Sequence, residues 1–128
     1  MPLVRIDLAQ GKSPDYRKAI GEVVYDAMVK TLGVPKDDRF QVITEHPAEG
    51  LIFDRIYLGF QRTADCIFIQ VTLSEGRTVD KKQAFYEAIA DGLHERIKLR
   101  REDVFINLIE VKKENWSFGN GVAQYVQL

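Results

Sequence analysis

Pro2 is the first residue in this chain whose type and position are suited to chemistry. A methionine that precedes a small residue such as proline is usually removed, and its removal would leave Pro2 with a free secondary amine. The pKa of a free α-amino group is about 7.7 to 8.0, so this amine would titrate near physiological pH. An apolar pocket favours the neutral amine, which accepts a proton, whereas a nearby carboxylate favours the cation, which donates one. The alternative is an inert proline that begins a strand where no backbone donor is needed.

A cation and a carboxylate lie in turns elsewhere in the chain. Arg77 follows Gly76 at the expected start of a helix, where a guanidinium can hold a carboxylate through two parallel hydrogen bonds, helped by backbone N–H groups. Its alternative is a solvated surface charge. Asp38 lies in the turn PKDDR, where an aspartate often caps the backbone, so a structural role for it is at least as common. The adjacent Asp37 is the weaker candidate.

Other reactive residue types do not form a recognisable site. Cys66 begins the apolar run CIFI, which favours a core role in a reducing compartment over a nucleophile. His46 and His94 have no second ligand at metal spacing, so we expect no metal. Gly119 and Gly121 lack the flanking strand, helix and lysine that a phosphate-binding loop needs. These residue types therefore predict neither a metal site nor a phosphate-binding loop.

Composition limits the possible partners. The chain has 128 residues, and its 18 Lys and Arg nearly balance its 19 Asp and Glu. This balance gives no general attraction to nucleic acid or to an anionic membrane, so any anion site must be local. A run of about 18 apolar residues and a charged-then-apolar leader are both lacking, which favours a cytoplasmic location.

The elements that must position these residues come from an internal repeat. Shifting the chain by 65 positions aligns residues 6–45 with residues 71–110 without a gap. An ungapped match of this length indicates a duplicated unit. The identical pairs are Leu8 with Leu73, Gly11 with Gly76, Asp15 with Asp80, Ala19 with Ala84, Glu22 with Glu87, Asp26 with Asp91, Asp38 with Asp103, Phe40 with Phe105, and Glu45 with Glu110.

Each copy predicts a strand, a helix and a strand. LVRIDL and IFIQVTL alternate apolar and polar residues, as a strand with one buried face does. Ser13 and Thr78 are expected to cap the helices that follow, and the first helix should end near Gly33. RFQVITE and VFINLIE form the second strands. Strand, helix and strand make a right-handed crossover with parallel strands, so two units predict an α/β (α+β sandwich) fold with a four-stranded sheet and two helices on one face.

We expect residues 1–128 to form one domain. The first βαβ unit spans residues 2–45, a link spans 46–65, the second unit spans 66–110 and a tail spans 111–128. The run LIFDRIYLGF within the link alternates and predicts an extra edge strand or hairpin. Since the helices cover only one face of the sheet, the other face needs cover from further subunits, with the extra strand and the tail as interface elements. These features predict a homo-oligomer.

These residues together resemble the tautomerase superfamily. The shared features are an N-terminal proline heading a strand, a G-[RK]-[ST] turn that opens a helix, and the duplicated βαβ unit. The stretches YDAMVKTLGVPKDDRFQ and NWSFGNG are similar to the malonate semialdehyde decarboxylase branch, and the similarity extends over essentially the whole chain. The resemblance implies a homotrimer of double units that acts on a small carboxylate-bearing substrate without a cofactor.

The resemblance also implies roles for particular residues. Pro2 would transfer protons, and Asp38 would activate water or orient the substrate carbonyl, leaving Asp103 as a relic of duplication. Arg77 would bind the substrate carboxylate. Trp116, Phe118 and Tyr125 would form an apolar wall, although packing of the tail at an interface is equally compatible. Lys12 takes the place of Arg77 in the first copy, where a surface charge is the favoured interpretation.

One departure from the branch bears on function. The decarboxylase pattern has arginines on both sides of one residue, whereas this chain has Glu75-Gly76-Arg77. A pocket with one cation and an added carboxylate should hold a malonate-type substrate less firmly. We therefore expect keto–enol tautomerisation of a small oxo or enol acid. The alternatives are decarboxylation of malonate semialdehyde, hydration of 3-oxo or unsaturated acids, and a trimeric binding module without turnover.

Overall fold

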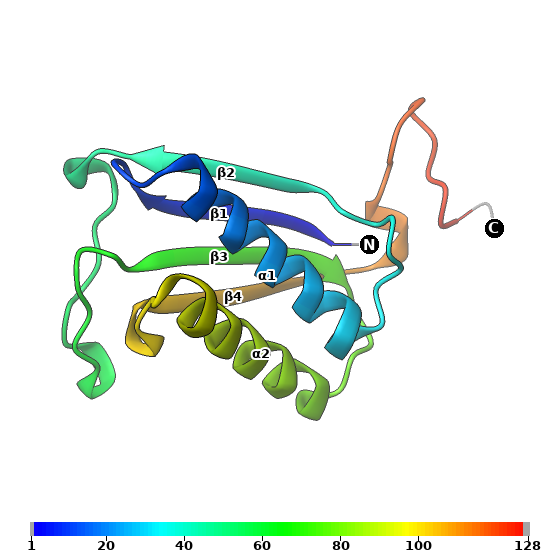
Figure 1. The fold of residues 1–128 in the computed structure, drawn as a ribbon. Coiled ribbons are helices and arrows are strands. Elements are labelled where there is room, and N and C mark those ends of the chain that lie inside the picture. Colours follow the sequence, from blue (N-terminus) through cyan, green and yellow to red (C-terminus); the bar gives the residue numbers. More distant parts are fainter. Residues whose placement is uncertain (1, 127–128) are drawn as a thin grey trace.

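The computed structural model describes residues 2–126, so the expected removal of Met1 lies outside the described residues. Six main elements follow one another along the chain (Figure 1). The first unit contains β1 (Leu3–Ala9), α1 (Pro14–Leu32) and β2 (Gln41–His46), and the second contains β3 (Ile67–Ser74), α2 (Val79–Ile97) and β4 (Val104–Val111). The predicted tandem βαβ units are thereby confirmed. Compared with the predicted strands, β2 begins two residues later and ends one residue later, and β4 ends one residue later.

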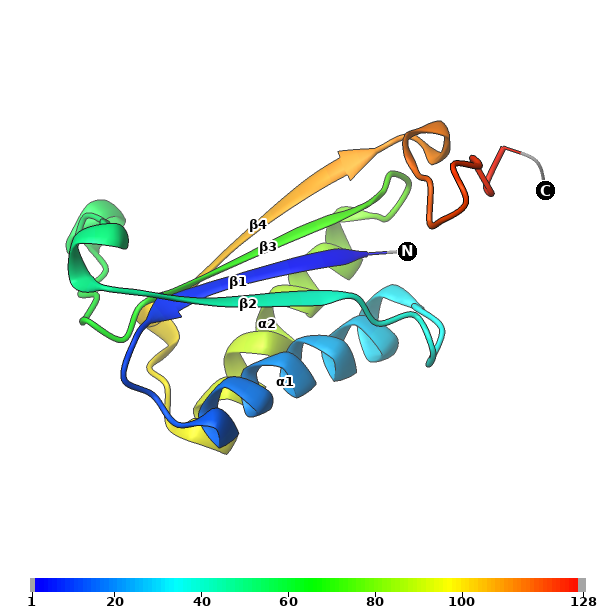
Figure 2. The same ribbon diagram turned by 90° about the horizontal axis from the view of Figure 1, so that it is seen from above.

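The four strands form one sheet in the order β2-β1-β3-β4. Strands are parallel within each unit, and the units join through an antiparallel pairing of β1 with β3 that places Leu3 opposite Thr72. Both helices lie on one face of the sheet (Figure 2). Because β1 and β3 run in opposite directions, the start of β1 lies beside the end of β3. Pro2 is therefore at the same end of the sheet as the turn that carries Arg77.

Alternation of the side chains fills the space between the sheet and the helices. Val4 and Ile6 of β1 and Ile69 and Val71 of β3 are fully buried, as the period of two requires. The apolar stripes of the helices complete this core with Ile20, Val24 and Met28 from α1 and Phe85, Ile89 and Leu93 from α2.

Local capping signals fix where the helices begin and end. The hydroxyl of Ser13 accepts a hydrogen bond from the N–H of Tyr16 at 3.1 Å, and the hydroxyl of Thr78 accepts one from Lys81 at 3.3 Å. Helix α1 ends at Gly33, whose φ of 69° lies in the left-handed region that glycine adopts without strain. None of the helices among residues 2–126 is long and apolar enough to cross a membrane.

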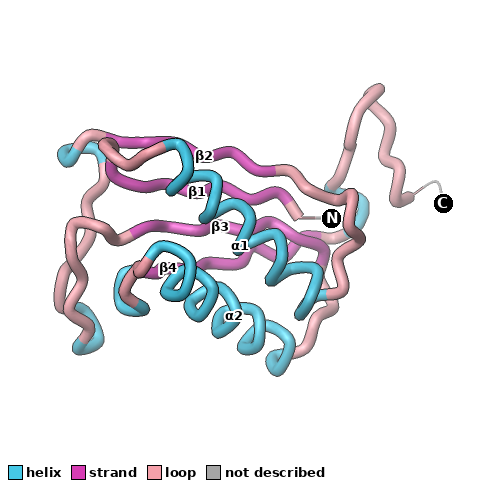
Figure 3. The backbone as a smooth tube through the Cα atoms, in the orientation of Figure 1, coloured by secondary structure: helices cyan, strands magenta, loops and turns pink. Residues whose placement is uncertain are grey.

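The predicted extra strand in the link is wrong. Residues 51–60 contain no strand, and the link forms a loop with two short helical turns at Ala48–Gly50 and Tyr57–Gly59 (Figure 3). The Asp54 carboxylate accepts a hydrogen bond from the N–H of Ile56 at 2.8 Å, and Leu58 has a left-handed φ of 60°. These local turns replace extended backbone. The alternating apolar residues also find no partner strand within the described chain.

The face of the sheet opposite the helices remains open. Phe40, Phe105 and Ile109 on this face are 50%, 46% and 40% exposed. Apolar residues of the link add to this surface, since Ile52 and Tyr57 line a cavity together with Phe105 and are 82% and 63% exposed. An apolar surface of this extent on one side of a small chain is typical of an interface.

Candidate active site

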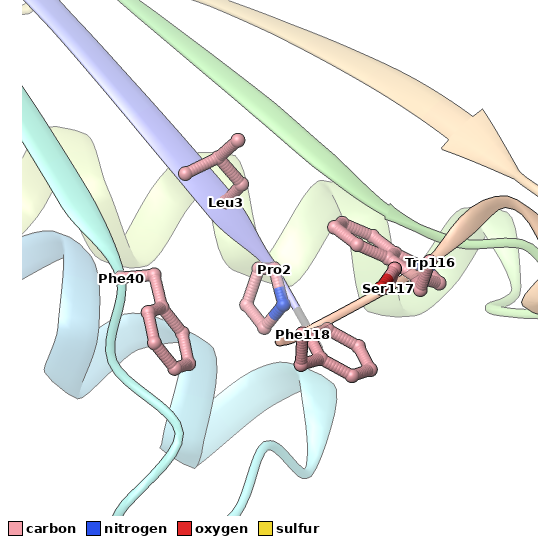
Figure 4. A pocket seen from close by; sticks show the side chains of 6 residues that line it. All are labelled: Pro2, Leu3, Phe40, Trp116, Ser117 and Phe118. Atoms are coloured by element: carbon pink, nitrogen blue, oxygen red, sulfur yellow. The ribbon is translucent and has the colours of Figure 1, made fainter. Parts of the chain in front are cut away.

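A cavity of about 240 Å³ opens at the end of the sheet where β1 begins. Pro2 immediately precedes β1, and Phe40 immediately precedes β2. The N–H of Val4 donates to the carbonyl of Phe40 at 3.0 Å, which holds Phe40 beside the start of β1. Pro2 is buried, and in Figure 4 its ring lies between Phe40 and the tail residues. The residues that line the cavity are Pro2, Leu3, Phe40, Trp116, Ser117 and Phe118.

The aromatic wall of this cavity comes from the tail. The rings of Trp116 and Phe118 are stacked with centroids 5.4 Å apart, and Tyr125 packs edge-on against Phe118 at 5.0 Å. The side chain of Gln124 closes the loop between them, because its amide oxygen accepts from the N–H of Phe118 and its amide nitrogen donates to the carbonyl of Gly119, both at 2.9 Å. The structure thus brings the three aromatic residues singled out from the sequence together, two of them lining the cavity.

Arg77 lies beside this wall rather than in the lining of the cavity. Its Nη1 donates to the carbonyl of Ser74 at 3.0 Å, and the Ser74 hydroxyl accepts from the indole Nε1 of Trp116 at 3.1 Å. Arg77 is half-buried, and its guanidinium has donors besides the one that bonds Ser74. Glu75 is exposed, and its N–H bonds to the carbonyl of Val111 at 2.9 Å. Glu75 is not one of the lining residues.

Asp38 is buried in the turn between α1 and β2. Its side chain is only 5% exposed, whereas Asp37 is exposed. The pKa of Tyr125 is raised, first by burial and then by the negative charge of Asp38, while the positive charge of Arg77 opposes the rise. Both charged residues therefore act on Tyr125. Neither Asp38 nor Arg77 is one of the residues that line the cavity.

The repeat-equivalent residues at the opposite end of the sheet are arranged differently. Asp103 is fully buried, and its two carboxylate oxygens accept from the N–H and the hydroxyl of Thr63 at 2.7 and 2.6 Å. Lys12 forms an ion pair with Asp65 at 2.8 Å, and this hydrogen bond is the main cause that raises the pKa of Lys12. Thr63 and Asp65 of the link thus bind the charged side chains of Asp103 and Lys12 in this copy.

A second cavity of about 240 Å³ lies at that end. It is lined in part by Phe53, Phe68 and Phe105. At the 65-residue offset these correspond to Phe118, Leu3 and Phe40 of the first cavity, while Ile67 stands in the place of Pro2. The second cavity therefore has an aromatic lining like the first, but it has no proline amine.

Several residues at the site were not singled out from the sequence as site residues. The identity of Phe40 with Phe105 in the repeat was an available signal for Phe40. Ser74 and Gln124 gave none, because their contacts depend on how the tail folds back.

Burial raises the pKa of the Cys66 thiol to about 11, in keeping with a core role. Residues 2–126 contain no group of three potential ligands that could hold a metal ion.

Comparisons with known proteins agree on one family. A family model described as a tautomerase enzyme matches residues 38–119, and a second with the same description matches residues 2–59. Probable tautomerase YusQ of Bacillus subtilis (strain 168) is 39% identical over 127 residues, which cover 99% of this chain and 100% of that protein.

Solved structures show the same relationship. The structure of FG41 malonate semialdehyde decarboxylase inhibited by 3-bromopropiolate is 42% identical, with a TM-score of 0.91 and coverage of 98% of this chain and 95% of that one. A fused 4-OT, described as a symmetric trimer, shares the fold at 24% identity, with a TM-score of 0.80 and coverage of 98% and 99%. This chain therefore belongs to the tautomerase superfamily, and within it to the group that is similar to malonate semialdehyde decarboxylase.

Proposed function

We propose that this protein is a cofactor-independent enzyme that uses the amine of Pro2 to transfer protons on a small oxo or enol carboxylic acid. The observation that carries the proposal is the position of Pro2, which is buried in a cavity lined mainly by apolar and aromatic side chains. An apolar environment disfavours the charged form of an amine. Once Met1 is removed, the neutral amine of Pro2 is suited to accept a proton from an enol or an activated carbon.

Arg77 and Asp38 would complete the reaction. Arg77 would bind the carboxylate of the substrate with guanidinium donors other than the one that bonds Ser74. Asp38 would orient the oxygen at which the double bond shifts. Trp116 and Phe118 would exclude water, which strengthens these electrostatic contacts. The amine would take a proton from one atom of the substrate and return it to another, so no oxidant or second substrate is required.

Keto–enol tautomerisation of phenylpyruvate tests the proposal. Pro2→Ala should lower turnover strongly, because a primary amine replaces a positioned secondary one. Arg77→Ala should lower kcat/KM by about 10 to 100 fold, because a charge-assisted hydrogen bond contributes roughly 1.5 to 3 kcal/mol. Lys12→Ala is the matched control at the equivalent repeat position and should leave kcat/KM unchanged. Equal losses in the Arg77 and Lys12 variants would contradict the assignment.

Decarboxylation of malonate semialdehyde, or hydration of a related 3-oxo or unsaturated acid, is the second candidate. The observation that favours it is the 42% identity to FG41 malonate semialdehyde decarboxylase. Glu75 opposes it because the branch has an arginine at this position. Glu75→Arg should therefore create or increase decarboxylation, since a second cation stabilises the developing enolate. Efficient decarboxylation by the unaltered protein, with no change in the variant, would make this candidate the main activity.

We also propose that the protein assembles as a homotrimer, in which the open face of the sheet is buried between copies. The exposure of Phe40, Phe105 and Ile109 supports this assembly. A trimeric binding module without turnover is the alternative that is not an enzyme. It would bind a small carboxylate near Arg77 but show no proton transfer at Pro2.

A further inference from the structure

Ser74 is a buried polar residue on the open face of the sheet. It closes β3 and lies on the same face as Phe68, Gln70 and Thr72, all of which are more exposed. Ser74 is only 8% exposed, because Trp116 of the tail folds back over this end of the strand. A buried hydroxyl has to be satisfied by hydrogen bonding. Its partner here is a residue of the aromatic wall.

Ser74 contacts two residues of the candidate site at once. Its carbonyl accepts a hydrogen bond from Nη1 of Arg77 at 3.0 Å, and its hydroxyl accepts one from Nε1 of Trp116 at 3.1 Å. The indole N–H is a donor only, and the Ser74 hydroxyl satisfies it. Trp116 in turn stacks on Phe118. One residue at the end of β3 therefore connects the cation with the wall of the cavity.

The internal repeat provides a natural comparison. At the 65-residue offset, Ser74 corresponds to Ala9 and Trp116 corresponds to Leu51. Neither the acceptor nor the donor exists at the opposite end of the sheet, although a cavity of the same volume lies there. The turn between a strand and a helix in this fold therefore does not require the hydroxyl. The pair occurs only at the end that carries Pro2.

We propose that Ser74 is a positioning residue, which orients the Trp116 indole through its hydroxyl and the Arg77 guanidinium through its carbonyl. The kinetic part of this inference rests on the proposed function, whereas the orientation of Trp116 does not. Substrate held between Arg77 and the aromatic wall requires both to keep a fixed separation. Loss of the hydroxyl leaves the Arg77 contact, which uses the backbone, and releases only the indole.

Fluorescence tests the orientation without any assay of activity. Trp116 is the only tryptophan, so emission reports on this ring alone. Ser74→Ala should shift the emission to longer wavelength and increase quenching by acrylamide, and Ser74→Thr, which keeps an acceptor, should restore both. Thr72→Val is the matched control, since it removes a hydroxyl from the same strand and face. Emission and quenching in Ser74→Ala equal to those of the unaltered protein would overturn the proposal.

Kinetics of phenylpyruvate tautomerisation test the consequence. Ser74→Ala should raise KM by about 2 to 10 fold, the effect of one ordinary hydrogen bond, and change kcat less. Trp116→Phe lacks the donor, so adding Ser74→Ala to it should raise KM no further. An equal rise in both backgrounds would show a general structural effect and overturn the positioning role. An unaltered protein with no turnover would refute the proposed function alone, because the fluorescence result stands separately.

Discussion

Asp38 and Asp103 occupy the same position of the repeat and are both buried, but we propose different roles for them. Asp103 is fixed by two hydrogen bonds from Thr63 of the link. After burial, the negative charge of Asp38 is the next cause that raises the pKa of Tyr125, which packs against the cavity-lining Phe118. We therefore propose that Asp103 holds the link in place, whereas Asp38 acts on a ligand.

The proposed roles predict that the same substitution, Asp to Asn, lowers stability at one position and activity at the other. Asp103→Asn should lower the free energy of unfolding by about 1 to 3 kcal/mol, because an amide cannot accept from both Thr63 donors as a carboxylate does. Its kcat/KM should stay close to that of the unaltered protein. Asp38→Asn should lower kcat/KM instead. Urea unfolding and tautomerisation rates measure the two effects, and a catalytic loss confined to the Asp103 variant would reverse the assignment.

The electrostatic coupling at Tyr125 predicts a measurable change in its pKa. Asp38→Asn removes a negative charge that opposes ionisation of the phenol, so the pKa of Tyr125 should fall toward its ordinary value. Arg77→Ala removes a positive charge that favours ionisation, so the pKa should rise further. Tyrosine ring ¹³C NMR measures both shifts, with Tyr125→Phe to assign the signal. A pKa insensitive to both changes would separate these charges from the aromatic wall.

At the scale of elements, local sequence signals predicted the two βαβ units because each signal acts within a few residues. Alternation placed Val4 and Ile69 in the core, and the hydroxyls of Ser13 and Thr78 begin the helices. The predicted strand in the link was wrong because its residues alternate like a strand but fold into turns around Asp54. Pairing of a strand depends on a partner that the link itself does not encode.

The candidate site was predictable only in part for the same reason. The aromatic wall could be anticipated from Trp116, Phe118 and Tyr125. Its connections through Ser74 and Gln124 could not, because they form when the tail returns to the end of β3. Contacts between segments far apart in the chain leave no periodic pattern.

The ends of the two helices provide a prediction at this scale. Gly33 and Lys98 are repeat-equivalent, and both have left-handed backbone, with φ of 69° and 59°. Lys98→Gly should raise the free energy of unfolding by about 0.5 to 1 kcal/mol, because glycine avoids the left-handed penalty but adds disorder to the unfolded chain. Gly33→Ala should lower it by a similar amount. Urea unfolding measures both, and changes of the same sign would contradict this explanation.

For the whole molecule, the open face of the sheet is the feature that demands an explanation. Apolar side chains of this face and of the link remain exposed in the single chain. Light scattering on the purified protein should therefore give a mass near three chains. Phe105→Glu, which places a charge on the open face, should lower this mass. A stable monomer of the unaltered protein at micromolar concentration would remove the argument for assembly.

The proposed function depends on proton transfer by the free amine of Pro2. The most direct test compares two preparations of the same sequence, one with Met1 removed and one in which Met1 is retained by inhibiting its aminopeptidase, each verified by intact mass. Both should fold alike, but only the first has a basic nitrogen at Pro2, because an amide nitrogen does not accept protons near neutral pH. Phenylpyruvate tautomerisation should occur with the first preparation and fall to background with the second. Equal turnover by the two would contradict the account.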